Sequence, residues 1–140
     1  MDATQAIIYY FNSAPGGVHN DLWNDLQGRM EEGEIIDDNT YPRAAIQNIT
    51  DVSDNVFAKK GKNLLRQLSI VSTSLSEIKL MRDHAETLFD NCQLNITGYS
   101  LAWMRLTNII GPSRAIGVLV EGVENVWECH LEFELDIQQS

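Results

Sequence analysis

The chain has 140 residues, which is enough for one domain with one hydrophobic core. Hydrophobic residues make up 44% of it, too many for a disordered chain, and no apolar run approaches the ~20 residues that a membrane-spanning helix needs. The formal net charge of −10 disfavours a basic protein that binds nucleic acid.

Residues 1–33 are predicted to form an N-terminal helical region. Asp2 is a suitable cap for a first helix, which should end at Pro15-Gly16-Gly17 because proline and glycine disfavour its continuation. A second helix is expected from an apolar stripe at spacing four, with Gly33 as its C-terminal stop. The stripe consists of Val18, Leu22, Leu26 and Met30.

A strand is expected over residues 43–49, and a returning strand over residues 64–73, because apolar residues alternate in both. Between them, residues 51–63 contain Asp, Ser, Asn and Gly, and they predict a long hairpin loop. Such loops tend to be functional, although a solvated tip would have the same composition. The loop carries three lysines: Lys59, Lys60 and Lys62.

Ser74 and Glu77 have the spacing of a capping box, which predicts a helix from Leu75 to about Asn91. Apolar residues recur along one face of this helix, so that face is expected to pack on the sheet. They are Ile78, Met81, Ala85, Leu88, Phe89 and Cys92.

Two more strands are expected in the last third of the chain. Residues 101–110 predict one, which ends at Gly111-Pro112-Ser113, and residues 114–124 connect it to the other at 126–137. The last strand alternates strictly, so one of its faces is apolar and the other is polar and acidic. The apolar residues are Trp127, Cys129, Leu131, Phe133, Leu135 and Ile137, and the polar ones are Glu128, His130, Glu132, Glu134 and Asp136.

Together these elements predict an α+β fold in a single domain over residues 1–140. Two β-hairpins would form a mainly antiparallel four-stranded sheet with helices packed on one face. The helices would cover Trp127, Leu131 and Phe133, and the acidic side of the last strand would form the other face. Cys92 and Cys129 are expected to be buried free thiols, as in proteins made in a reducing compartment.

No residue pattern indicates catalysis, a metal site or a cofactor, so we expect that the protein is not an enzyme. His19, His84 and His130 are scattered, and the nucleophile, phosphate-loop and dinucleotide motifs are missing. Glu128, His130 and Glu132 could present metal ligands on one strand face, but neighbours at spacing two are about 7 Å apart and no second ligand cluster completes a shell.

Charge is distributed unevenly along the chain. No Lys or Arg follows Arg114, while acidic residues continue to the end, and lysines gather in the loop at 59–62. A basic tip and an acidic sheet face suit head-to-tail contact between copies, which closes into a ring if the rotation is right. Ordinary surface patchiness would produce the same pattern.

The order of elements resembles the tail terminator, or tail-completion, proteins of long-tailed bacteriophages, including the lambda-like minor tail protein that caps the tail tube. The resemblance covers nearly the whole chain. It rests on an N-terminal helix, a long hairpin loop and four further segments: Tyr41-Pro42-Arg43-Ala44-Ala45-Ile46, Leu68-Ser69-Ile70-Val71, the helix around residues 81–89, and the closing strand at 127–135.

The resemblance implies an α+β protein that assembles as a ring, expected to be a homohexamer, at the head-proximal end of the tail. Such a ring stops growth of the tail tube, contacts the tail tube protein and the head-completion or connector protein, and lets DNA pass through it. The protein would be made in the host cytoplasm and reside in the virion, with no membrane contact and no cofactor.

Two sets of residues are candidates for this role. Lys59, Lys60 and Lys62 would contact a neighbouring subunit or the tail tube, and Glu128, Glu132, Glu134 and Asp136 would face the lumen and repel passing DNA. The alternatives are another neck protein, such as the head-closure or stopper component, and a small acidic binding or immunity-type module that masks a basic partner.

Overall fold

The computed structural model describes residues 3–33, 41–56, 59–114 and 126–139, with backbone alone at 50–56, 59–62, 100, 101 and 139. The elements in chain order are α1 (Ala3–Asn12), the 3-10 turn η1 (Pro15–Gly17), α2 (Asp21–Leu26), β1 (Met30–Glu32), β2 (Arg43–Val56), β3 (Lys59–Ser72), α3 (Leu75–Phe89), β4 (Cys92–Gln93), β5 (Tyr99–Arg114) and β6 (Trp127–Gln139). The predicted cap Asp2 and the connection at 115–125 lie outside the described residues.

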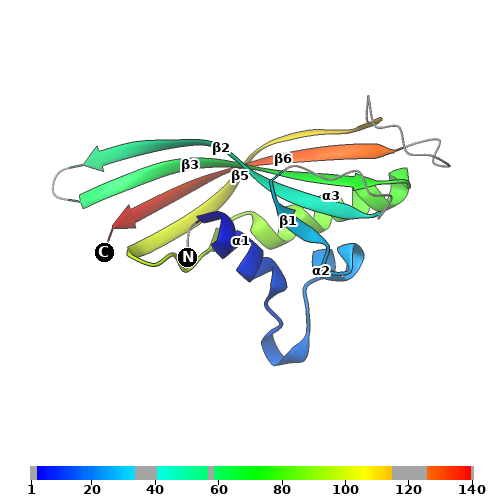
Figure 1. Cartoon of the computed structure of the whole chain (residues 1–140), viewed down its shortest axis with the longest axis horizontal. Helices are drawn as coiled ribbons and strands as arrows, with labels where there is room; N and C mark the ends of the chain where they lie inside the picture. Colours follow the sequence, from blue (N-terminus) through cyan, green and yellow to red (C-terminus); the bar gives the residue numbers. More distant parts are fainter. Residues whose placement is uncertain (1–2, 34–40, 57–58, 115–125, 140) are drawn as a thin grey trace.

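The sheet has six strands in the order β1-β2-β3-β6-β5-β4, so the predicted four-stranded antiparallel sheet is wrong. β1 runs parallel to β2, all other neighbours are antiparallel, and the long strands curl across the molecule (Figure 1). The two unpredicted strands have three and two residues. Strands this short carry no alternation for a sequence pattern to detect.

β1 arises where the sequence predicted the end of a helix. Asn20 caps α2 by accepting a hydrogen bond from Trp23 N, and the helix ends at Leu26 because Gln27 and Gly28 adopt left-handed conformations, with φ of 53° and 75°. A Cβ on Gly28 would lie 3.0 Å from the Trp23 ring. The chain turns here, so Met30 pairs with β2 instead of extending the helix.

The predicted loop at 51–63 is also wrong, because β2 and β3 form a continuous hairpin through it. Their ladder runs from Arg43 with Val71 to Val56 with Lys59, with one register shift between Asn48 and Thr50. The composition of the segment is that of a loop, but backbone pairing satisfies its N–H and C=O groups whatever the side chains are. This hairpin projects from the body of the molecule as an arm, seen at the left of Figure 1.

β5 continues beyond the predicted break at Gly111 and Pro112. Ser113 still pairs with Glu128 of β6, and the irregularity is absorbed as a register shift. Gly111 is required there: its φ is 91°, and a Cβ would lie 2.9 Å from the backbone oxygen of Glu128.

The helices lie on one side of the sheet, and the hydrophobic core fills the space between them (Figure 1). Phe133 of β6 is fully buried and meets Phe89 of α3 edge-on, with ring centroids 5.7 Å apart. Arg66 of β3 lies on the same face, where its Nε donates to Thr4 Oγ1 of α1 at 3.0 Å. The core thus holds both an aromatic contact to α3 and a polar contact to α1.

Half of the predicted capping box of α3 is confirmed: Ser74 caps the helix, whereas the Ser74 N–H donates to Ser72 Oγ at 3.1 Å. The Ser74 side chain accepts a hydrogen bond from Glu77 N at 3.3 Å, and the helix runs from Leu75 to Phe89. Four of the six predicted apolar residues are buried on the helix itself, namely Ile78, Met81, Ala85 and Phe89.

Replacing Ser74 with alanine should lower the free energy of unfolding by about 1 kcal/mol, because the Glu77 N–H would lose its acceptor. Urea unfolding followed by circular dichroism measures this change. Thr73→Ala is the matched control, since Thr73 is exposed and precedes the cap; Ser76 is unsuitable because its Oγ lies 3.1 Å from Ser74 Oγ. An unaltered midpoint for Ser74→Ala would contradict the assigned helix start.

Candidate functional site on the open face of the sheet

The acidic side of β6 lies on the face of the sheet that points away from the helices. Leu131, Phe133 and Leu135 are buried in the core, and the residues that alternate with them therefore point the other way. Glu128, Glu132, Glu134 and Asp136 are all half-buried on this open face. The sequence prediction that these four residues share one face is confirmed.

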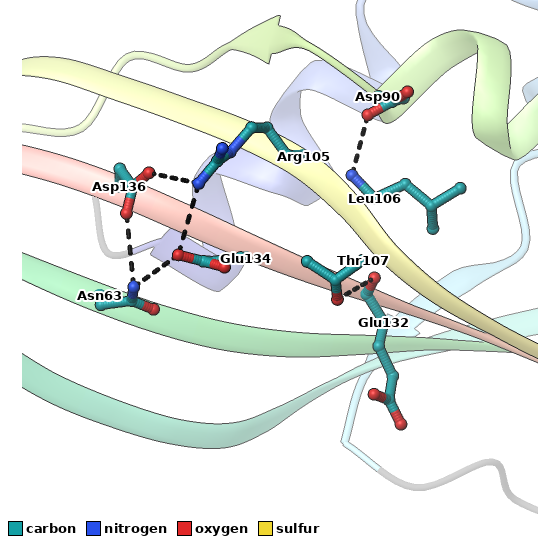
Figure 2. A network of polar contacts seen from close by, with 8 residues as sticks. All are labelled: Asn63, Asp90, Arg105, Leu106, Thr107, Glu132, Glu134 and Asp136. Carbon is teal, nitrogen blue, oxygen red and sulfur yellow. Dashed lines mark hydrogen bonds and ion pairs between the residues drawn. The ribbon is translucent and has the colours of Figure 1, made fainter.

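Two of these carboxylates are partly neutralised by a network that sequence reasoning missed (Figure 2). Arg105 of β5 contacts Asp136 at 2.9 Å and Glu134 at 3.5 Å. Asn63 of β3 donates from the opposite side to Glu134 at 2.6 Å and to Asp136 at 3.4 Å. The network joins three strands, so this end of the face is both less acidic and more tightly held than the sequence predicts.

Trp103 completes this end of the face. The guanidinium of Arg105 lies 5.1 Å from the centre of its ring, and 37% of Trp103 remains exposed to solvent. Tryptophan and arginine are enriched among residues that dominate protein interfaces. Trp103 and Arg105 are two residues apart on β5 and therefore share a strand face, but their position beside the carboxylates follows only from the pairing of β5 with β6.

At the other end, Ser69, His130 and Glu128 form a short polar row. Ser69 Oγ lies 2.8 Å from His130 Nδ1, and His130 Nε2 lies 3.6 Å from Glu128. A serine beside a histidine and a carboxylate occurs in nucleophilic catalysis. Ser69 lies on a central strand, so its backbone amide belongs to the ladders and is not available as an oxyanion donor. The row links β3 to β6 across the sheet face.

A beta-bulge fixes β5 against the helix layer. Its register shifts between Leu106 and Asn108, and the Leu106 N–H donates to Asp90 Oδ1 at the end of α3, at 2.9 Å (Figure 2). Thr107 Oγ1 donates to the Glu132 carbonyl at 3.1 Å. Both contacts hold the bulged strand in place, so the network beside it keeps its geometry.

Lys59, Lys60 and Lys62 lie at the start of β3, at the tip of the arm, and their side chains are outside what the structure describes. The ladder pairs Lys62 with Ile137, next to the acidic end of β6. The lysine segment and the acidic strand therefore adjoin at Lys62, while Lys59 and Lys60 pair, among the described residues, with β2 alone.

The histidines do not converge on a site. His84 forms a hydrogen bond with Asp25. His19 stacks on Trp23, and the centroids of these two rings lie 3.7 Å apart. Across residues 3–33, 41–56, 59–114 and 126–139, no group of three or more His, Cys, Asp or Glu residues could hold a metal ion. In the same part of the chain, no helix has the length and hydropathy needed to cross a membrane.

Both cysteines are free and buried, as predicted. Burial raises the pKa of the Cys92 thiol to about 12 and that of the Cys129 thiol to about 11, from an ordinary value of 9.0. At neutral pH both thiols are therefore protonated and unreactive in the folded chain.

The raised thiol pKa values predict a loss of stability in alkaline solution. Above pH 9 the unfolded chain releases thiol protons that the folded chain retains up to about pH 11 to 12, so the free energy of unfolding falls across this window. A Cys92→Ala/Cys129→Ala variant should show a shallower fall than the wild type in urea unfolding at pH 8, 9.5 and 11. Equal slopes for the two proteins would contradict the assigned cause.

Comparisons with known proteins support the fold. The sequence matches no protein-family model and no curated protein. Among solved structures, it is similar to a chain described as "Virion of native gene transfer agent (GTA) particle", with a TM-score of 0.73, 8% sequence identity, and coverage of 97% of this chain and 94% of that chain. The described chain therefore shares its fold, over nearly its whole length, with a chain of that virion.

Proposed function

We propose that this protein is a structural component of a phage-like virion, and that it forms a ring at the head-proximal end of the tail. The ring ends growth of the tail tube and joins the tail to the head connector, and DNA passes through it. The observation that carries the proposal is the full-length fold similarity to a chain of a gene transfer agent virion, at a TM-score of 0.73. The sequence resemblance to tail terminators independently favours the same role.

The open sheet face fits the lumen of such a ring. A channel for DNA should not bind phosphate, and Glu128, Glu132, Glu134 and Asp136 present negative charge on this face. Arg105 reduces the charge at one end without reversing it, because it meets two carboxylates. The helices would then form the outside of the ring.

Deleting the gene tests the role. Tails without a terminator should vary in length and remain separate from filled heads, and plasmid-borne protein should restore normal particles. Electron microscopy of lysates measures tail length and joining. Tails of normal length beside unjoined heads would instead indicate a head-closure or stopper protein, and normal particles would overturn any neck role.

The strongly acidic composition also favours a second candidate, a small module that masks a basic partner, because the net charge is −10. Light scattering of the purified protein, alone and with tail tubes, separates the two. A ring of about six copies supports the structural role, and rings that form only on tubes support it equally. A monomer at every concentration, even with tubes present, supports the acidic module.

A further inference from the structure

The long strands on the two sides of the sheet each leave part of one edge without a neighbouring strand among the described residues. β1 pairs with β2 only at 44–46, so residues 49–56 of β2 have β3 on one side alone. Residues 92–93 of β4 pair with residues 103–104 of β5. Among the described residues, residues 107–110 of β5 therefore have a neighbouring strand, β6, on one side only. Backbone N–H and C=O groups along such edges can pair with another strand.

We propose that the β2 edge (residues 49–56) of one copy pairs with the β5 edge (residues 107–110) of the next, so that successive sheets join into one continuous wall. This inference rests on the proposed ring and names the contact that closes it. The partner is a second copy of this chain, and three observations favour it over a strand from another protein.

The first observation is strand direction. β2, β3, β6 and β5 are each antiparallel to the next, so β2 and β5 run in opposite directions. In a ring all copies point the same way along the axis. The β5 edge of one copy therefore meets the β2 edge of the next in antiparallel orientation, which is the more stable of the two ladders.

The second observation is the position of the two edges. Ile110 of β5 pairs with His130 of β6, His130 pairs with Ser69 of β3, and Ser69 pairs with Ala45 of β2. Ile110 and Ala45 therefore lie at the same position along the strand direction, on opposite sides of the sheet. Val52, in the middle of the β2 edge, is seven residues farther along its strand. Pairing the two edges therefore displaces each copy along the strand direction relative to its neighbour.

Closing tilted strands into a ring also requires a displacement along the strands, slightly smaller than the seven residues that separate Ala45 from Val52. Four strands at ~4.8 Å spacing are about 19 Å wide, and a tilt of ~35–45° displaces the next copy by about 13–19 Å, or about four to six residues. An offset of five residues already brings Ile110 opposite Thr50, inside the β2 edge. Within residues 3–33, 41–56, 59–114 and 126–139, no strand pairs with these edges at the two places where a ring needs them.

The third observation is charge. The β5 edge has the sequence Thr-Asn-Ile-Ile and no charged residue, whereas the β2 edge contains Asp51 and Asp54. Two copies of a strongly acidic chain can therefore pair here without opposing like charges. Pro112 lacks an N–H group and limits the β5 edge at its far end, as expected for an edge strand.

Disulfide cross-linking in the full-length protein tests the contact. In a Cys92→Ala/Cys129→Ala background, Ile110→Cys is combined in separate proteins with Thr50→Cys, Asp51→Cys or Val52→Cys, which correspond to offsets of five to seven residues from Ala45. Consecutive positions are needed because neighbouring strand residues point to opposite faces. Oxidation with tail tubes present should link copies into a ladder on a non-reducing gel, up to the full ring. Combining Ile110→Cys with Lys79→Cys, an exposed position on α3, is the control that should give no ladder.

Imaging the same samples separates this inference from the proposed function. A ladder together with rings supports both, and a ladder with open filaments supports the contact alone. Rings without a ladder overturn the contact and leave the function standing, and dimers from Val52→Cys by itself would indicate a two-fold contact instead. If neither rings nor a ladder form, both proposals fail. As a second variant, Ile110→Lys should reduce ring formation at least tenfold while circular dichroism stays unchanged.

Discussion

Phe133→Ala is expected to lower the free energy of unfolding by roughly 3–5 kcal/mol, as for other truncations of fully buried aromatic residues. The side chain has no exposed surface and packs against Phe89 at a centroid distance of 5.7 Å. Its removal would leave a cavity at the centre of the sheet, between β6 and α3. Urea unfolding of the purified variant measures the effect.

Glu132→Ala is the matched control, because Glu132 neighbours Phe133 on β6 but lies half-buried on the open face. It should change stability by well under 1 kcal/mol, in the range of surface substitutions. Comparable losses for the two variants would mean that the two faces of β6 are assigned wrongly.

Replacing Lys59, Lys60 and Lys62 with glutamate is expected to abolish ring formation and tail joining while the chain still folds. The hypothesis is that these lysines dock on an acidic surface of a neighbouring subunit or of the tail tube, because they lie at the tip of the projecting arm. Glutamates would oppose like charges across that contact. Raising salt should weaken the wild-type contact in the same direction, because salt screens exposed charges beyond ~8 Å.

Circular dichroism checks folding of this variant, and electron microscopy of tails mixed with it reports joining. The control is the triple change to arginine, which keeps the charge and should keep activity. The arm also brings Lys62 beside the acidic end of β6. An effect of the glutamates within one chain would lower the unfolding midpoint, so this measurement distinguishes it from an effect on the contact between chains. Normal joining by the glutamate variant would show that the lysines form only a solvated tip and make no assembly contact.

Local signals in the sequence predicted strands that overlap β2, β3, β5 and β6, and they placed two elements most closely. The alternation at 126–137 predicted β6, which spans Trp127–Gln139, and the capping box at Ser74 predicted the start of α3. In both cases the information lies in the element's own residues, because side-chain period and cap chemistry depend only on neighbours along the chain. The sharing of one face by the four acidic residues of β6 follows from the same alternation.

Tertiary structure decided the features that no local pattern encodes, including how far β2 and β3 extend. The arm is a paired hairpin because backbone pairing of β2 with β3, and of β3 with β6, outweighs a loop-like composition. β1 exists because a turn at Gly28 brings Met30 beside β2. The Arg105 network and the Ser69–His130 contact join residues at least 29 positions apart, whose meeting depends on strand order and register. Register is a property of the assembled sheet, since one residue of slip would move every side chain to the opposite face.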